Sequence, residues 1–200
     1  MDAKPRVGVL ALQGDFEAHR AALEQAGAEA VEVRTAAELG GVEGLIIPGG
    51  ESSTMLKLIE LENLFDELRR FGASKPIFGT CAGAILLARG VINPAQPSLE
   101  LMDIDVERNA YGRQLDSRIA RVHAEPGAGL EGDDIEAVFI RAPIIRRVGR
   151  EARVLATYEN APVLVEQGRH LAATFHPELT RDARIHRRFL EKVASTAAVG

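Results

Sequence analysis

The segment KPIFGTCAGAILLARG, residues 75–90, joins an apolar run to a second run of small and aliphatic residues through a turn around Cys81. The first part predicts a buried strand over 75–80, and the second predicts a helix over 82–90. Cys81 then lies where a strand turns sharply into a helix, and such a turn holds a side chain away from the sheet. The segment therefore predicts a strand–turn–helix unit that presents one thiol.

The rest of the chain repeats this alternation of strand and helix. Upstream, strand-like runs lie at 6–12, 30–35 and 44–48, and amphipathic helices at 15–27 and 52–72. Downstream, β-rich segments lie at 99–124 and 135–149, strands joined by turns at 153–179, and a last helix at 184–195. This order predicts an α/β fold with a mainly parallel central sheet and helices on both faces. No linker or repeat divides the chain, so we expect a single domain over 1–200.

Composition and charge narrow the class of protein. The chain is 46% hydrophobic and 26% charged, an ordinary globular balance, and its net charge of −5 argues against nucleic acid as the main partner. No apolar run approaches the length of a membrane span, so we expect no membrane partner. A single cysteine forms no internal disulfide, which favours a reducing compartment and a cytoplasmic location.

The surroundings of Cys81 suit a nucleophile. Gly79 and Gly83 leave room for a tight backbone and close helix packing. The N-terminus of a helix favours the thiolate, which is the reactive form. Free cysteines are also common as inert buried residues, and the local pattern alone fits both interpretations equally well.

A nucleophilic cysteine needs a base, and the base needs a group that orients it. His176 follows an apolar strand and opens the sequence HPEL, in which Pro177 stiffens the turn. Residues two apart in an extended segment point the same way, so Glu178 is expected beside His176. The pair predicts a general base with its orienting carboxylate.

The other four histidines carry weaker signals. His123 and His186 are interpreted as surface or core residues without a chemical role, and His170 as part of a surface turn. His19 lies on the first helix near Gly14 and stays ambiguous. No histidine or cysteine spacing resembles a metal site, so no metal is expected.

Attack on a carbonyl also calls for an oxyanion hole. The N–H of Ala82 directly follows the nucleophile, and Gly50 in the turn PGGE at 48–51 lets backbone approach a substrate closely. Parallel strands end at one edge of a sheet, which brings the turns at 13–14, 48–51 and 80–83 together. Taken alone, a Pro-Gly-Gly turn is equally well a plain loop.

Five further motifs narrow the interpretation. They are LQGDFEAH at 12–19, PGGESST at 48–54, ERNAYGRQ at 107–114, FIRAP at 139–143 and TFHPELT at 174–180. With GTCAG, they resemble class I (triad) glutamine amidotransferases, and among these the glutaminase subunits of pyridoxal 5′-phosphate synthase, the PdxT/SNO family. The resemblance covers nearly the whole chain. The family more often has glycine at Ala11, and phenylalanine is also common at Tyr111.

The resemblance implies roles for matching positions. Cys81 matches the nucleophile, His176 the general base and Glu178 the orienting carboxylate. The implied glutamine contacts are Gly50, Glu51, Ser52, Arg108, Ile140 and Arg141, and the implied oxyanion hole is formed by Gly50 and Ala82. An arginine suits the α-carboxylate of glutamine, and Glu51 or backbone carbonyls suit its α-ammonium group.

The resemblance also implies a three-layer, flavodoxin-like fold and hydrolysis of L-glutamine to L-glutamate and ammonia without metal or cofactor. The ammonia would pass to a separate (β/α)8-barrel synthase subunit of the PdxS family, in a large heteromeric complex that makes pyridoxal 5′-phosphate (vitamin B6). Docking is implied to activate the enzyme, and we hypothesise that the Gly49–Gly50 peptide reorients. The alternatives are another class I amidotransferase subunit, a DJ-1-like cysteine hydrolase, or a binding module without catalysis.

Overall fold

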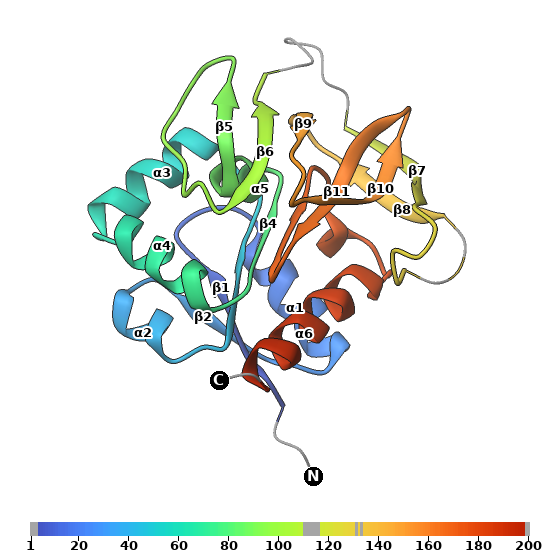
Figure 1. Ribbon diagram of the computed structural model, residues 1–200. Coiled ribbons are helices and arrows are strands. Elements are labelled where there is room, and N and C mark those ends of the chain that lie inside the picture. Colours follow the sequence, from blue (N-terminus) through green and yellow to red (C-terminus); the bar gives the residue numbers. More distant parts are fainter. Residues whose placement is uncertain (1–3, 110–116, 131, 133, 199–200) are drawn as a thin grey trace.

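The computed structural model describes residues 4–109, 117–130, 132 and 134–198. Within them a large central sheet runs through the molecule (Figure 1). Its strand order is β2 (Glu29–Val33), β1 (Arg6–Leu10), β3 (Gly44–Ile47), β4 (Ile77–Thr80), β12 (His170–Ala173), β11 (Ala161–Gln167), β10 (Arg153–Tyr158), β7 (Arg118–Ala124) and β8 (Ile135–Phe139).

The sheet has a parallel part and an antiparallel part. Neighbouring strands from β2 to β12 run parallel, in the order 2-1-3-4 followed by β12. This is the order of flavodoxin-like doubly wound sheets, in which ligands bind outside the carboxyl ends of the strands. From β12 to β8 each neighbouring pair is antiparallel. The predicted parallel, helix-covered sheet is confirmed, and the β-rich second half extends it.

Helices cover both faces of the parallel part (Figure 1). One face carries α1 (Phe16–Ala26) and α6 (Arg184–Ala197), and the other carries α2 (Ala36–Gly40), α3 (Ser52–Leu61), α4 (Phe65–Ser74) and α5 (Ala82–Leu87). On β3, Leu45 and Ile47 join the core under α2–α5, while Ile46 joins the core under α1 and α6. This alternation is what a strand buried on both faces requires.

A smaller sheet packs against the core under α2–α5. It consists of β5 (Ala88–Ile92), β6 (Met102–Glu107) and β9 (Ile144–Val148). The predicted helix over 82–90 is therefore wrong in its last third, because the backbone becomes extended at Ala88 and the chain pairs with β6 in parallel. Tertiary strand pairing outweighs the helical preference of alanine and leucine here.

The predicted helix over 52–72 is wrong in its middle, where α3 ends and α4 begins. Asn63 has φ 55°, its N–H bonds the carbonyl of Glu60, and the N–H of Leu64 bonds the carbonyl of Ile59. This is a Schellman motif with asparagine in the left-handed position. Ile59 and Leu64 are both fully buried, so the apolar pattern continues across a real helix end.

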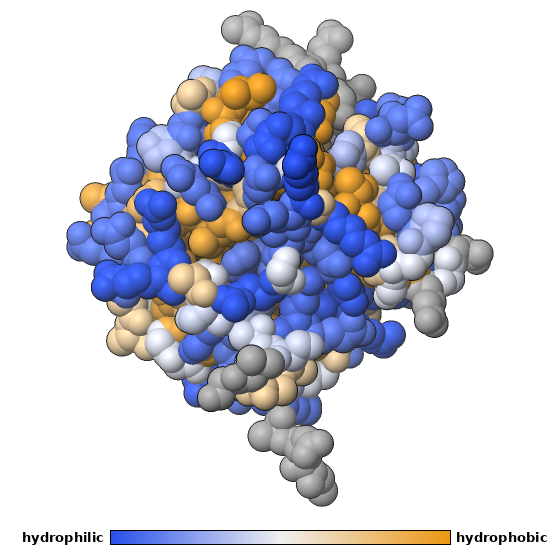
Figure 2. Space-filling view, in the orientation of Figure 1, coloured by the Kyte–Doolittle hydropathy of each residue, from blue (hydrophilic) through white to orange (hydrophobic). Residues whose placement is uncertain are grey.

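The short helix α2 lies outside the predicted elements. Thr35 and Glu38 form a reciprocal capping box at its start, a signal that is visible in the sequence T-x-x-E. Among the described residues, no helix is both long and apolar enough to span a membrane. The face drawn in Figure 2 is mostly hydrophilic, with hydrophobic residues showing between polar ones.

Candidate active site

Cys81 occupies a strained turn between β4 and α5. Its φ is 50° and its ψ is −104°, an uncommon conformation for any residue but glycine, and its N–H bonds the carbonyl of Ala173 at 2.8 Å. A Cβ on Gly79 would lie 2.4 Å from the carbonyl oxygen of Gly83, and one on Gly83 would lie 2.1 Å from that of Ile47. The predicted need for small residues around the cysteine is confirmed.

His176 and Glu178 form a buried pair after β12. Nδ1 of His176 lies 2.7 Å from Oε1 of Glu178, and each residue is only 7% exposed. The predicted pairing is confirmed, but the expected extended backbone is wrong, because a 3₁₀ turn, η1 (Pro177–Leu179), brings Glu178 back under the ring.

Gly49 lies between His176 and Cys81. A Cβ at Gly49 would be 2.4 Å from Cε1 of His176 and 3.3 Å from Cβ of Cys81. The imidazole of His176 and Cβ of Cys81 therefore both lie next to the same backbone position. The turn after β3, the elbow after β4 and the turn after β12 meet there, as the parallel strands predict.

The electrostatics of His176 favour the imidazolium. Burial disfavours its charged form, but hydrogen bonding to Cys81 and Glu178, together with their negative charges, raises the pKa of His176 to about 10. At neutral pH the ring therefore carries a proton that it can deliver to a leaving group.

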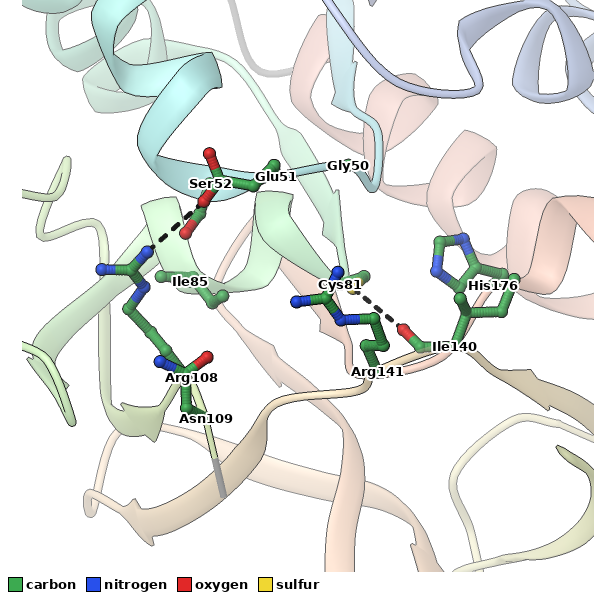
Figure 3. Close-up of a pocket in the computed structure, with 10 residues that line it drawn as sticks. All are labelled: Gly50, Glu51, Ser52, Cys81, Ile85, Arg108, Asn109, Ile140, Arg141 and His176. Carbon is green, nitrogen blue, oxygen red and sulfur yellow. Dashed lines mark hydrogen bonds and ion pairs between the residues drawn. The ribbon is translucent and has the colours of Figure 1, made fainter. Parts of the chain in front are cut away.

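A cavity of about 270 Å³ opens beside the thiol (Figure 3). This volume is slightly below the roughly 300–1,000 Å³ that is usual for drug-sized ligands, and so fits a small metabolite. It is lined by Cys81, His176 and all six predicted substrate contacts, namely Gly50, Glu51, Ser52, Arg108, Ile140 and Arg141. Glu178 lies behind His176, and Ala82 is buried at the start of α5.

Two lining residues, Ile85 and Asn109, are missing from the predicted set. Ile85 follows Cys81 by one helical turn, and its N–H bonds the carbonyl of Cys81 at 3.2 Å. The spacing of four residues within a helix was the available signal for Ile85. Of the motif at 107–114, positions 110–114, including Tyr111, lie outside the described residues.

Arg108 reaches the cavity wall opposite the thiol. Its Nη2 donates to Oγ of Ser53 at 2.6 Å and lies 3.6 Å from Oε1 of Glu51, as Figure 3 shows for the ion pair with Glu51. Its Nε is buried and has no hydrogen-bond partner among the described residues. A buried donor without a partner is costly, so the protein groups leave the hydrogen-bonding capacity of this guanidinium incompletely used.

Glu51 builds the turn as well as the cavity. Its carboxylate accepts from the N–H groups of Ser53 at 3.0 Å and Thr54 at 2.7 Å, which caps α3. Partial burial opposes ionisation, but hydrogen bonds from Thr54 and Ser53 lower the pKa of Glu51 to about 2. The hydroxyl of Ser52, in contrast, is buried and donates to Gln96 at 3.2 Å.

The loop after β1 packs against the turn that contains Gly49 and Gly50. A Cβ on Gly14 would lie 1.8 Å from the carbonyl oxygen of Gly49, so this oxygen rests against Gly14. Because a trans peptide points its C=O and N–H in opposite directions, the N–H of Gly50 faces away from Gly14. Gln13 adds a second contact, since its Oε1 accepts from the N–H of Glu51 at 3.2 Å.

The remaining histidines differ from one another. His123 is exposed, as expected for a surface residue, and lies 2.7 Å from Asp134. The interpretation of His170 as surface is wrong, because it is 7% exposed and accepts from the N–H of Ile77 at 3.2 Å. His19 and His186 are fully buried behind Glu178. In the part of the chain that the structure describes, no cluster of three or more His, Cys, Asp or Glu residues could hold a metal.

A thiol in a strained strand–helix turn, beside a histidine paired with a carboxylate, is the arrangement of a cysteine-dependent amidohydrolase. The sequence profile of the SNO glutamine amidotransferase family matches residues 9–195. The chain belongs to this family.

Similar proteins agree with this assignment. The chain is 63% identical over 190 residues to the pyridoxal 5′-phosphate synthase subunit PdxT of Solibacter usitatus (strain Ellin6076), covering 94% of this chain and 99% of that protein. A crystal structure of a glutamine amidotransferase has a TM-score of 0.86 and 49% identity, covering 94% of this chain and 98% of its own.

A putative GMP synthase component from Thermoplasma acidophilum shares the fold, with a TM-score of 0.71 at 18% identity over 100% of this chain and 98% of its own. The three-layer amidotransferase fold is therefore confirmed.

Proposed function

We propose that this chain is the glutaminase subunit of pyridoxal 5′-phosphate synthase, which hydrolyses L-glutamine to L-glutamate and ammonia. The observation that carries the proposal is the buried His176–Glu178 pair beside Cys81 on one cavity, in a chain 63% identical to a protein named as a subunit of that synthase. The amidotransferase family supports glutamine as the substrate.

In the proposed reaction, the thiolate of Cys81 attacks the side-chain amide carbon of glutamine, and its negative charge passes to the carbonyl oxygen. His176, protonated by virtue of its raised pKa, gives its proton to the departing nitrogen, and ammonia leaves behind a γ-glutamyl thioester. The neutral His176 then takes a proton from water, which attacks the thioester and releases glutamate. Glu178 holds the ring and stabilises its charge through the 2.7 Å bond to Nδ1.

The oxyanion is proposed to rest on the N–H groups of Ala82 and Gly50. Ala82 begins α5, so its N–H has no intrahelical carbonyl to bond. The N–H of Gly50 faces away from Gly14, on a turn that lines the cavity. Two such donors are the usual stabilisers of a tetrahedral intermediate.

Glutamine is proposed to bind with its α-carboxylate on Arg108, whose Nε is a buried donor without a partner among the described residues. Glu51, ionised and directed at the same cavity, offers a countercharge for the α-ammonium group. Arg141 and the backbone of Ile140 complete the wall next to the thiol, where the Ile140 carbonyl lies 3.9 Å from Sγ.

Ammonia released to solvent is mostly protonated and lost as a nucleophile, which argues for direct delivery. We infer a separate partner, a (β/α)8-barrel synthase subunit of the PdxS family, in a heteromeric complex in the cytoplasm. The name of the similar protein as a synthase subunit supports such a partner. Residues 1–200 would act as one amidotransferase domain, which the continuous sheet from β2 to β8 supports.

The test is glutamate release from glutamine by the purified chain, with and without its cognate synthase subunit. Cys81→Ala serves as the control for the thiol, and asparagine as the control for side-chain length. We expect glutamate release that rises with the partner and disappears in the variant. A folded complex without glutamate release, or undiminished release by Cys81→Ala, would contradict the proposal.

A further inference from the structure

A chain of buried polar side chains continues behind Glu178, beyond the residues that face the cavity. Nε2 of His19 lies 3.3 Å from Oε2 of Glu178 and 3.0 Å from Oγ1 of Thr80. Nδ1 of His19 lies 3.1 Å from Nε2 of His186. His19, Thr80 and His186 are all 0% exposed, so water does not take part in these contacts from the surface.

The carboxylate of Glu178 depends on His19. Oε1 is bonded to His176, whereas Oε2 makes no full hydrogen bond among the described residues. Nε2 of His19 makes its hydrogen bond with the Thr80 hydroxyl, and Oε2 of Glu178 lies beside the same nitrogen without an aligned hydrogen bond, so this polar edge of the ring is the group that faces Oε2. Burying a carboxylate with only one hydrogen-bond partner costs free energy, so the contact between His19 and Oε2 matters for the stability of ionised Glu178.

The contacts select one tautomer for each ring. If Nε2 of His19 carries the proton, it faces two oxygens, and Nδ1 accepts from Nε2–H of His186. The Nδ1 of His186, which has no partner among the described residues, is then a bare acceptor. The opposite assignment would point a lone pair of His19 at a carboxylate and leave a buried N–H of His186 without an acceptor. The first assignment is favoured on both counts.

We propose that His19 is a positioning residue for the glutaminase reaction: its Nε2–H holds Glu178 and Thr80 together, and His186 fixes the tautomer that makes this possible. Thr80 directly precedes the nucleophile, and Glu178 orients the base. One imidazole thus joins the elbow that carries Cys81 to the turn that carries His176. The inference rests on the proposed function, because it assigns His19 to that same catalytic site.

The charges around His19 support a neutral ring. The titratable groups that face it are Glu178 from η1, His186 from α6 and His176 at longer range. Burial, and then the neighbouring His186 and His176, lower the pKa of His19 well below its usual 6.5, and burial lowers that of His186 to about 4. At neutral pH the network therefore contributes dipoles rather than a second positive charge.

The test uses alkylation of Cys81 by iodoacetamide, which reports the reactive thiolate without any glutamine turnover. Cys81 is the only cysteine of the chain, so incorporation of the label is unambiguous. Loss of the His19 contact makes ionised Glu178 less favourable, which weakens the imidazolium of His176 and hence the thiolate beside it. In His19→Leu we expect the pH midpoint of alkylation to rise by about one unit, because the polar contact that favours the charged carboxylate is lost.

Two conservative variants separate positioning from packing. In His19→Gln the amide nitrogen stands near the position of Nε2 and can still donate to Glu178, so we expect a midpoint close to that of the unchanged protein. In His19→Asn the amide stands near the position of Nδ1 and cannot reach Glu178, so the midpoint should shift as in His19→Leu. This comparison stays decisive if the leucine variant does not fold.

His170→Leu is the matched control, because it removes another buried, hydrogen-bonded histidine that lies at the opposite end of β12. We expect it to lower the melting temperature without moving the alkylation midpoint. In the complex with the synthase subunit, His19→Asn should lower kcat about tenfold with little change in KM for glutamine.

An unchanged midpoint and kcat in His19→Asn would overturn the inference, as would equal shifts in His19→Gln and His19→Asn. Because alkylation needs no substrate, the two proposals can be separated: a shift of the midpoint in a complex without glutaminase activity would refute the proposed function, while the part of His19 in positioning Glu178 and supporting the thiolate would stand.

Discussion

Replacing Gly49 by alanine tests the geometry of the candidate site with a single methyl group. Gly49 has no positive φ, so its backbone conformation accepts alanine without strain. The added Cβ would lie 2.4 Å from Cε1 and 3.1 Å from Nδ1 of His176, and 3.3 Å from Cβ of Cys81. Carbon atoms in contact are about 3.5–4.0 Å apart, so the imidazole has to move by about 1 Å.

This displacement of the imidazole determines the expected effects on activity and stability. The ring cannot stay in place, and moving it disturbs both the 2.7 Å bond to Glu178 and its approach to the thiol. A misplacement of about 1 Å in a catalytic group lowers the rate by about 100-fold. Crowding of this kind destabilises a core by about 1–3 kcal/mol, which lowers the melting temperature of a domain of this size by only several degrees. Activity should therefore fall far more than stability.

The assay is glutamate release in the presence of the synthase subunit, together with thermal melting of the isolated chain. Gly40→Ala is the matched control, since it adds the same methyl group at a position with no heavy atom within 4 Å. We expect Gly40→Ala to keep its activity. Gly49→Ala with activity within threefold of the unchanged protein would refute the placement of His176 against this turn.

Four further outcomes follow from the same geometry. Glu178→Gln should lower the pKa of His176 by about one to two units and reduce kcat at least tenfold, measured by the pH profile of glutamate release; an unchanged profile would contradict the pairing. Arg108→Ala should raise KM for glutamine about tenfold or more with a smaller effect on kcat, and an effect on kcat alone would contradict carboxylate binding. Gly83→Ala should lower the free energy of unfolding by at least about 1–3 kcal/mol in denaturant titration, because its Cβ would lie 2.1 Å from a carbonyl oxygen of β3 that cannot move away; equal stability would show that the elbow relaxes. Burial lowers the pKa of His170 to about 4, below the unfolded value, so the unfolded chain binds more protons between pH 6.5 and 4 and stability falls as the pH is lowered through this window. Since buried His19 and His186 contribute in the same direction, His170→Gln should make that dependence less steep without abolishing it, and an identical slope would contradict the buried neutral ring.

The parallel half of the fold was predictable because its signals are local. Each of β1, β3 and β4 is a short, mostly apolar strand followed by a glycine-containing turn, and each turn lies at the edge where ligands bind in such sheets. The triad could be predicted for the same reason. Cys81 is recognisable by its flanking glycines, and His176 and Glu178 are two residues apart. The expected extended backbone is nevertheless wrong, because a 3₁₀ turn brings His176 and Glu178 together.

One error arose from a local signal in the sequence, and the other two arose where distant residues decide the local structure. The break between α3 and α4 is set by Asn63 in a left-handed conformation, while the buried residues on either side keep a helical pattern. The end of α5 is set by pairing of β5 with β6, which no local propensity predicts. His170 follows a turn in the sequence, yet it is buried and bonded to the N–H of Ile77, 93 residues away.

The contrast between local signals and distant partners also applies to the site. The residues that line the cavity have local signals in the sequence, and the buried residues behind them do not. The proposed nucleophile and base can be recognised in the sequence because each needs a special backbone conformation, which calls for glycine or proline beside the reactive residue. His19 needs no special backbone, since it sits within an ordinary helix, and its partners Thr80 and His186 are 61 and 167 residues away. Support for a catalytic group through buried side chains is therefore invisible to motif spacing. This support becomes apparent only from the fold. The structure shows that Oε2 of Glu178 lacks a hydrogen-bond partner among the described residues, that Nε2 of His19 faces it, and that Nδ1 of His19 is bonded to His186.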